Sequence, residues 1–330
     1  MQKITREVLI DKAADLLTSG TVDRVLGWKK GEFDWDVTPA VFKSAEDMKK
    51  DFVFDSFCGA NFSGYLVSET KKSEGKVLVF LKPCDTYSFN QLLTEHRFDR
   101  EKVYALGVPC NGMLDAASIR SKYETAVSCT DDGENVTVNT MYDGSFTEKR
   151  ENLLAERCAN CKSGKHVAYD ELLGEDGEVK DSARFDEVKR IESMTPDERF
   201  AFWQGELSRC IRCNACRDVC PACTCEKCVF DNPESGVENK AAADSFEEKM
   251  FHIIRAFHVA GRCTDCGECS RVCPQHIPLH LLNRKFIKDI NSFYGDYQAG
   301  AEVGSRAPIV NWTENDIEPS DAVRGGGKDA

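Results

Sequence analysis

The sequence predicts an α/β domain built from parallel βαβ units, followed by a mainly helical domain organised by cysteines. Two apolar strands in the first 130 residues each end in Pro-Cys and are each followed by a helical pattern. Alternation of strand and helix is typical of a parallel sheet. Further along the chain, CIRCNACRDVCP and CTDCGECSRVCP repeat one cysteine spacing, with 42 residues between Cys220 and Cys263.

Length and composition limit the classes of function. A chain of 330 residues predicts about two domains, and no apolar run approaches the roughly 18 residues of a membrane span. The N-terminal sequence MQKITREVLIDKAADLL predicts an amphipathic helix rather than a signal peptide, so we expect a cytoplasmic protein. Its 17 cysteines then favour metal ligation in an anaerobic or oxygen-protected setting. The net charge of −13 argues against non-specific nucleic-acid binding.

The first predicted elements are a helix over residues 5–18 and two strands. KVLVFLKPCD predicts a strand at 76–81 that leads into Cys84, and KVYALGVPC predicts one at 102–106 that leads into Cys110. Helical patterns follow both cysteines, the second over 111–122. Because parallel strands end at the same edge of a sheet, we expect Cys84 and Cys110 to be neighbours. The N-terminal amides of the following helices would favour their thiolate form.

A third metal centre is predicted from these two cysteines and a later pair. Cys158 and Cys161 form a Cys-x2-Cys motif with no partner pair nearby in the sequence. Together with Cys84 and Cys110 they make four ligands, and we hypothesise a [4Fe-4S] cluster on them, here called site 3. Two alternatives stay open: the site can hold zinc, and the two loop cysteines can be small buried apolar side chains.

The rest of the first half carries no visible chemistry. Weak alternation over 125–150, with turn signals at Asp132-Gly133 and Asp143-Gly144, predicts a β-ribbon. Cys58 and Cys129 lack a partner motif and are interpreted as structural, with Cys58 expected to lie nearer to site 3. A charged stretch follows and is interpreted as a solvated connection, after which Thr195-Pro196 begins a helix. We therefore divide the chain into an α/β domain with site 3 (1–165), a charged connection (166–195), a dicluster domain (196–295) and an extended tail (296–330).

The two cysteine runs have the spacing Cys-x2-Cys-x2-Cys-x3-Cys-Pro of bacterial-type iron–sulfur sites, in which the fourth cysteine ligates the other cluster. We expect this part to be a mainly helical, bacterial ferredoxin-like domain with two [4Fe-4S] clusters. Structural zinc is the alternative, but zinc sites usually consist of two separated Cys-x2-Cys pairs. A disulfide framework is disfavoured because a chain of this length can build an ordinary core. We assign cluster 1 to Cys210, Cys213, Cys216 and Cys273, and cluster 2 to Cys263, Cys266, Cys269 and Cys220.

Two amphipathic helices, over 245–261 and 279–294, are expected to cover and close this domain. His252 and His258 are interpreted as core-edge or surface residues, because thiolates already fill the eight ligand positions. Three further cysteines are interpreted as supporting thiols, with spare thiols or a substitute fourth ligand as alternatives: Cys223, Cys225 and Cys228. Five arginines beside the runs either offset cluster charge or face an acidic partner: Arg209, Arg212, Arg217, Arg262 and Arg271.

The segments CIRCNACRDVCPACTC and GRCTDCGECSRVCPQHIPLHLLNRK, with LKPCD at the end of the first strand, resemble a known family. It comprises the iron–sulfur subunits of anaerobic sulfite reductases, the sulfhydrogenase beta subunit and the corresponding subunit of flavin oxidoreductase and heterodisulfide reductase complexes. The resemblance is strong over residues 195–290 and looser over 50–165. A looser similarity is to the beta subunits of coenzyme F420 hydrogenases and dehydrogenases, which combine such clusters with FAD.

The resemblance implies an electron-transfer subunit of a cytoplasmic, anaerobic oxidoreductase complex, without a catalytic site of its own. It would relay single electrons between a flavoprotein subunit that handles NAD(P)H and a catalytic subunit of the hydrogenase, heterodisulfide-reductase-like or sulfite-reductase-like kind. Ferredoxin is a further candidate partner. The alternative is a FAD-containing beta subunit that reduces coenzyme F420 or NAD. No G-x-G-x-x-G loop is present in the sequence, and FAD is the less favoured cofactor.

Overall fold

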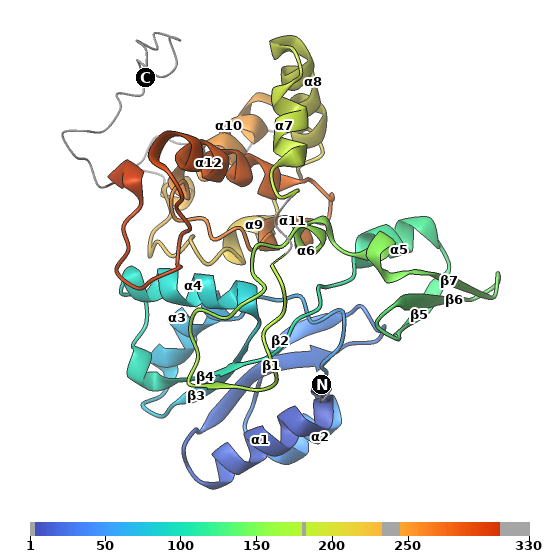
Figure 1. The fold of residues 1–330 in the computed structure, drawn as a ribbon, viewed down its shortest axis with the longest axis vertical. Helices are drawn as coiled ribbons and strands as arrows, with labels where there is room; N and C mark the ends of the chain where they lie inside the picture. The colour runs from blue at the N-terminus through green and yellow to red at the C-terminus, as the bar shows by residue number, and fades with distance from the viewer. Residues whose placement is uncertain (1–3, 180–182, 233–244, 311–330) are drawn as a thin grey trace.

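The computed structural model describes residues 4–179, 183–232 and 245–310 of the chain. A five-stranded sheet lies at the centre of the first half (Figure 1). β1 pairs with β2 in the antiparallel direction, whereas β1, β3, β4 and β8 run parallel to one another. The strand order is β2 (Val37–Phe42), β1 (Arg24–Lys30), β3 (Val77–Leu81), β4 (Val103–Gly107) and β8 (Glu171–Leu172).

Helices cover both faces of this sheet. α1 (Arg6–Thr18) and α2 (Ala45–Asp51) lie on one face, and α3 (Ser63–Lys72) and α4 (Pro83–Thr94) lie on the other, as Figure 1 shows. All five residues of β3 are fully buried. A parallel strand that is covered on both faces consists of apolar residues throughout, and this explains why VLVFL could be predicted as a strand from the sequence.

The predicted parallel βαβ arrangement is confirmed. In the register of β3 and β4, Leu81 pairs with Gly107, so the two strands end level with each other. Cys84 and Cys110 each follow three residues later, at the same edge of the sheet. The sequence did not predict β1 and β2. Pro39 interrupts the apolar pattern of β2, and the sheet tolerates it because β2 is an edge strand.

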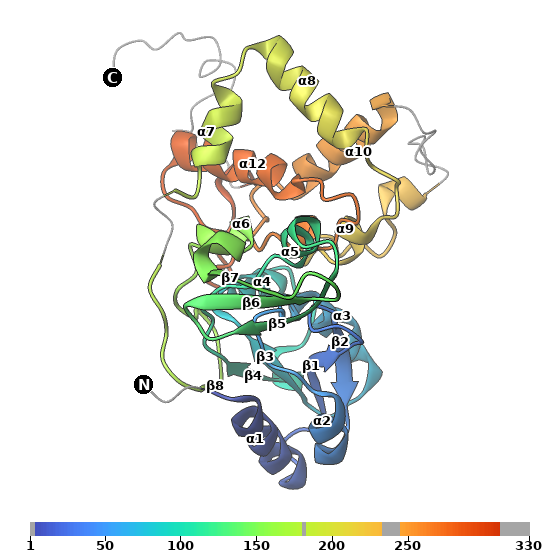
Figure 2. The same ribbon diagram turned by 90° about the vertical axis from the view of Figure 1, so that its right-hand side faces the viewer.

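A second, three-stranded antiparallel sheet confirms the predicted β-ribbon. It projects beside the first sheet in Figure 1 and faces the viewer in Figure 2. It contains β5 (Ala126–Asp131), β6 (Asn135–Thr140) and β7 (Ser145–Lys149), preceded by α5 (Ala116–Lys122). The helix predicted over 111–122 is wrong in its first turn, because it begins only at Ala116. Asp115 accepts from the amides of Ala117 and Ser118, and this cap fixes the start of the helix.

The second half of the chain is mainly helical, as predicted. Thr195 and Glu198 form a capping box at the start of α8, which confirms the predicted helix start. α12 spans the predicted residues. The elements are α6 (Glu156–Ala159), α7 (Asp186–Glu192), α8 (Pro196–Leu207), α9 (Ala215–Asp218), α10 (Ser245–His258), α11 (Glu268–Arg271) and α12 (Leu279–Tyr294), with short 3-10 turns at Arg100–Lys102, Arg150–Leu153, Val229–Asp231 and Pro308–Val310.

The described residues of the predicted charged connection (166–195), which are 166–179 and 183–195, include β8 and α7 and pack against their neighbours. His166 is buried, with Nε2 2.9 Å from the carbonyl oxygen of Leu81. Val188 and Ile191 of α7 form an apolar cluster with Leu281 of α12. Charged side chains on the outer face of α7 hid this short apolar stripe in the sequence.

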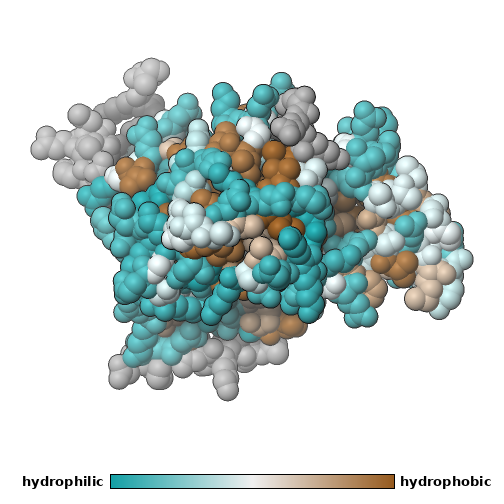
Figure 3. Space-filling model, turned by 90° about the horizontal axis from the view of Figure 1, so that it is seen from below, coloured by the Kyte–Doolittle hydropathy of each residue, from teal (hydrophilic) through white to brown (hydrophobic). Residues whose placement is uncertain are grey.

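The first part of the predicted tail also packs on the fold. Ala299 is buried, and Gly300 approaches the backbone of Tyr87 so closely that an added Cβ would collide with it. Gly304 donates its amide to the hydroxyl of Thr94. Residues 311–330 lie outside the described residues. Among the helices that the structure describes, none combines the length and the apolar character needed to cross a membrane. Seen from below, the molecule is mostly hydrophilic, with small apolar patches (Figure 3).

Candidate metal centres

The two cysteine runs adopt the same local structure. Arg212 and Asp265, at equivalent positions, both have left-handed backbones with φ of 52° and 59°. Asn214 and Gly267 repeat this two residues later with φ of 62° and 67°, and the short helices α9 and α11 follow at once. Three non-glycine residues in this strained region show that each loop is held in a tight curl. A curl of this kind lets three cysteines spaced by three face one centre.

The ligands predicted for cluster 1 lie together. Burial raises the pKa of the Cys216 thiol to about 11; the nearby Arg255 guanidinium opposes this shift, and the thiols of Cys210, Cys273 and Cys213 reinforce it. Cys273 belongs to the other run, so thiols of both runs are near one another here, and its ligation of cluster 1 stays a prediction. All four of these residues line one small hollow.

The ligands predicted for cluster 2 show the reciprocal arrangement. Burial raises the pKa of the Cys263 thiol well above its usual value, and Asp265, Cys266 and Cys220 act in the same direction. Burial also raises the pKa of Cys269 to about 12, opposed by Arg255 and reinforced by Cys220 and Cys216. Cys220 of the first run therefore stands among the cysteines of the second. The interaction of Cys269 with Cys216 places the two sites side by side.

The four cysteines predicted for site 3 also converge. Burial raises the pKa of Cys84, and the charge of Asp85 reinforces this shift whereas Lys82 opposes it. The thiols of Cys161 and Cys110 also raise this pKa. Burial likewise raises the pKa of Cys110 to about 12, with Cys158 as the next cause. Residues that follow two strand ends, together with Cys158 of α6 and Cys161 just after it, thus meet at the sheet edge.

The two strand-end cysteines reach this place differently. Cys84 lies in the first turn of α4, as predicted. Cys110 does not precede a helix, and the amide of Gly112 instead donates to its sulfur over 3.4 Å. The Arg150 side chain holds this loop, because Nη1 and Nη2 donate to the carbonyl oxygens of Asn111 and Gly112 at 2.8 and 2.7 Å. The Arg150 Nε also pairs with Asp131 at 2.8 Å.

The remaining predicted positions lie away from these centres or beside them. Cys58 is fully buried and hydrogen-bonds to Val53 and Asp55, whereas Cys129 lies on β5 of the ribbon. His252 is buried as a neighbour of cluster 1, with Nε2 3.2 Å from the Cys210 sulfur.

Three buried cations beside the cysteines were not singled out from the sequence. Lys82 pairs with Asp85 at 2.7 Å close to Cys84 and Cys110. Arg255 lies between the two runs. Arg157, next to Cys158 in the chain, donates to the carbonyl oxygen of Cys266 at 2.7 Å. The position of Arg157 next to a Cys-x2-Cys motif could have indicated from the sequence that it lies beside the cysteines. Nothing in the amphipathic pattern of α10 indicated this for Arg255.

Arg157 connects site 3 with cluster 2. Besides Cys266 it contacts the carboxylate of Glu268, which is fully buried and also binds Arg271. Burial opposes the ionisation of Glu268, but Arg271 and Arg157 outweigh it and lower the pKa of this carboxyl to about 2. Gly267 leaves room for this contact, because a Cβ there would lie 2.5 Å from Cδ of Arg157.

The donor set fits iron–sulfur clusters in its chemistry. Iron–sulfur clusters are bound by cysteine thiolates. A buried thiol with a raised pKa stays protonated until a metal displaces the proton. Buried cations beside each group offset the resulting negative charge. Within the described residues, no group of three or more His, Cys, Asp or Glu side chains is arranged to hold a single metal ion.

A large hollow adjoins the contact between site 3 and cluster 2. Its volume is about 690 Å³, within the range of cofactor pockets. Aromatic and cationic side chains from both halves of the chain line it, among them Trp35, Phe57, Lys122, Arg157 and Arg271.

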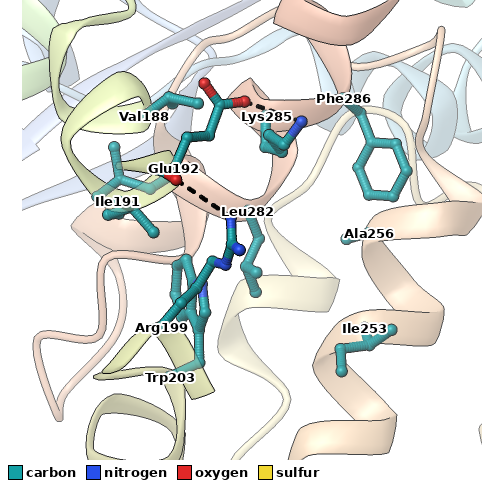
Figure 4. Close-up of a pocket in the computed structure, with 11 residues that line it drawn as sticks. Val188, Ile191, Glu192, Arg199, Trp203, Ile253, Ala256, Leu282, Lys285 and Phe286 are labelled. Carbon is teal, nitrogen blue, oxygen red and sulfur yellow. Dashed lines mark hydrogen bonds and ion pairs between the residues drawn. The ribbon is translucent and has the colours of Figure 1, made fainter. Parts of the chain in front are cut away.

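A smaller, apolar groove of about 200 Å³ lies between the helices α7, α8, α10 and α12 (Figure 4). Trp203 and Leu282 line it and also pack on the apolar cluster around Cys216 and Cys273. Glu192 at its rim is paired with Lys285 at 2.9 Å.

The profile of the family described as 4Fe-4S dicluster domain matches residues 206–277. These residues form an iron–sulfur domain. The dicluster domain contains both cysteine runs and α9 to α11, so the prediction of a 4Fe-4S dicluster segment is confirmed.

Two curated proteins are similar to almost the whole chain. One is the F420-dependent formate dehydrogenase subunit beta of Methanocaldococcus jannaschii, 22% identical over 90% of this chain and 92% of its own. The other is the F420-dependent formate dehydrogenase 1 subunit beta of Methanococcus maripaludis, 26% identical over 89% of this chain and 92% of its own. The looser of the two resemblances stated from the sequence is thereby confirmed.

Among solved structures, a chain in a study of xenon derivatization of the F420-reducing [NiFe] hydrogenase complex from Methanosarcina barkeri is similar. It covers 62% of this chain and 86% of its own, with 16% identity and a TM-score of 0.38. A likeness at this level supports no further conclusion.

Proposed function

We propose that the chain is an electron-transfer subunit of an oxidoreductase complex and that site 3, cluster 2 and cluster 1 form one row. [4Fe-4S] clusters accept and donate single electrons. The observation that supports the proposal is the closeness of the three cysteine groups. Arg157, next to Cys158, donates to the carbonyl oxygen of Cys266, and the thiols of Cys269 and Cys216 are near enough to interact electrostatically.

The two ends of the row differ in their surroundings. Cys213 of cluster 1 is exposed, so a redox partner can approach this end closely. The cysteines of site 3 lie at the edge of the sheet, beside the large hollow. Beta subunits are by name parts of larger complexes, and this supports a partner at each end: a flavoprotein or other two-electron donor at one and a catalytic or ferredoxin-like partner at the other.

Metal analysis of anaerobically purified full-length protein tests the proposal. We expect about 12 irons and as many acid-labile sulfides per chain, four for each cluster. Variants in which Cys84 or Cys161 is replaced by serine should lose about four irons and keep the rest. About eight irons in the unaltered chain, or zinc in site 3, would contradict the three-centre row and leave a two-cluster subunit.

The large hollow favours a second candidate function, in which the chain itself binds FAD and reduces F420 or a nicotinamide. Arg157 and Arg271 share the single carboxylate of Glu268, so the pair retains one positive charge that can meet the phosphates of such a ligand, and Trp35 and Phe57 can stack on a ring. The similar beta subunits are both F420-dependent by name. A bound flavin would lie beside the junction of site 3 and cluster 2.

The absorption spectrum of the cofactor extracted with acid separates the two candidates. An FAD-binding chain yields about one flavin per chain, and Ala117→Trp, which fills the hollow, should abolish it. Ala201→Trp, on the exposed side of α8, is the matched control and should bind flavin normally. If fully iron-loaded protein yields no flavin, the FAD-binding function is refuted and the electron-transfer function remains.

A further inference from the structure

Arg255 occupies a place that both clusters share. It lies on α10 and is only 4% exposed, and its Nη2 donates to the carbonyl oxygen of Cys216 at 2.8 Å. The charge of the guanidinium interacts with the thiols of Cys220, Cys269, Cys223 and Cys216. Two of these, Cys216 and Cys269, belong to different predicted clusters.

This charge has no carboxylate to balance it within the described residues. The other deeply buried arginines do: Arg284 pairs with Asp265 and Glu156, and Arg157 pairs with Glu268. No ion pair joins Arg255 to any described acid, and its Nε, buried as well, lacks a hydrogen-bond partner. A buried cation requires a compensating negative charge. Here the surrounding groups that can supply one are cysteine ligands.

The arginines that the sequence singled out do not provide an equivalent charge. Most are neutralised: Arg209 by Glu206, Arg217 by Asp218 and Asp231, Arg262 by Glu95 and Arg271 by Glu268. Arg212 stacks on the ring of Phe251, with Cζ 3.9 Å from its centroid. Arg255 is therefore the buried cation whose field acts on both clusters without an acid to cancel it in the described structure.

We propose that Arg255 is a positioning residue shared by clusters 1 and 2, which holds Cys216 in place and raises the reduction potentials of both clusters together. The proposal rests on the proposed function. Reduction adds one negative charge to a cluster, and a fixed cation in a low-dielectric interior stabilises the reduced form. Placed between two clusters, one cation acts on both and also lowers their mutual repulsion.

The test uses full-length, anaerobically purified protein and a redox titration followed by EPR spectroscopy. In Arg255→Gln, the ratio of reduced to oxidised protein at a given potential should fall at least tenfold for both clusters, which is about 59 mV for one electron. Arg255→Lys, which keeps the charge, should restore most of the potential. Arg217→Gln removes a partly exposed, acid-paired arginine near the same run and should leave both potentials unchanged.

Each outcome bears on the proposal. Unchanged potentials in Arg255→Gln, or an equal fall in Arg217→Gln, would overturn it. If Arg255→Gln loads no cluster whereas Arg255→Lys loads fully, the need for the charge is supported; loss of both clusters in Arg255→Lys as well would contradict a role of charge. Unaltered protein that contains no iron would instead refute the proposed function.

Discussion

The Nη1 atom of Arg157 lies 2.7 Å from the carbonyl oxygen of Cys266 and 2.7 Å from the carboxylate of Glu268. Arg157 precedes Cys158 in the chain, whereas Cys266 and Glu268 belong to the second cysteine run. One side chain therefore fastens site 3 to the dicluster domain, across 109 positions of sequence.

Replacing Arg157 by glutamine should destabilise the protein by about 1.5–3 kcal/mol, because it removes a buried hydrogen bond between charged groups. Glu268, which is fully buried, would keep only Arg271. Denaturant unfolding under anaerobic conditions measures the loss. Arg190→Gln breaks an exposed pair with Glu187 and should cost no more than about 1 kcal/mol. Equal effects of the two variants would refute the bridging role of Arg157.

If the fourth cysteine of each run ligates the cluster of the other run, cysteine variants from different runs should have the same EPR spectrum. Cys273→Ser should lose the same EPR signal as Cys216→Ser, because the two thiols interact and both are predicted ligands of cluster 1. Cys220→Ser should instead match Cys269→Ser. The reduced-state EPR spectra of the four variants provide the comparison. If Cys273→Ser and Cys269→Ser instead lose the same signal, each run ligates its own cluster.

The same spectra test whether Cys223 can replace Cys220 as a ligand. Cys223 is the substitute if Cys220→Ser keeps cluster 2 and the double variant Cys220→Ser, Cys223→Ser loses it.

The Arg150–Asp131 pair should make part of the stability depend on pH. Burial raises the pKa of Asp131, but hydrogen bonds from Ser56 and Arg150 outweigh it and hold the pKa below its usual value. The folded state therefore favours the ionised carboxyl, so the contribution is present above the unfolded pKa of about 3.9 and disappears as the pH falls below it.

Asp131→Asn tests this contribution. At pH 7 the variant should be about 1–3 kcal/mol less stable than the unaltered protein, and the difference should shrink below about pH 4. Because Arg150 also holds the loop of Cys110, site 3 should lose iron more readily to a chelator. Asp143→Asn, at an exposed turn, is the control. A difference that is independent of pH would contradict the assignment.

Because Lys82 and Asp85 form a buried ion pair, substitutions of the two residues should change the free energy of unfolding non-additively. Both side chains are at most 2% exposed and their charged atoms lie 2.7 Å apart. Asp85→Asn leaves Lys82 unpaired and should cost about 3–5 kcal/mol. The Lys82→Met, Asp85→Asn double variant should recover part of this loss, because no uncompensated charge remains. Thermal unfolding of the single and double variants measures the coupling energy.

Sequence reasoning predicted the features that depend on local spacing. The two cysteine runs, the β3 and β4 strands and the helix capped by Thr195 each carry a signal within about a dozen residues, and the structure contains all of them. Cys84 and Cys110 were placed together because the order of parallel strands fixes where their ends meet.

The features that the sequence did not reveal depend on contacts between distant segments. β1 and β2 were missed because a glycine and a proline weaken their pattern, although tertiary packing completes the strands. Between Cys110 and the helix that Asp115 caps, the chain forms a loop whose carbonyl groups at Asn111 and Gly112 bind Arg150, a residue 39 positions beyond Asn111. Arg255 looks like any charged residue of an amphipathic helix until the fold buries it.

The predicted exchange of the fourth cysteines would make maturation of the dicluster domain cooperative. Whichever cluster is inserted first would take ligands from both runs, so it would close the chain between the runs and remove loop-closure entropy before the second cluster is inserted. The second insertion would then meet three aligned sulfurs and a neighbouring fourth. Half-filled chains should therefore be scarce during biogenesis, and limited iron supply should yield a mixture of empty and complete molecules.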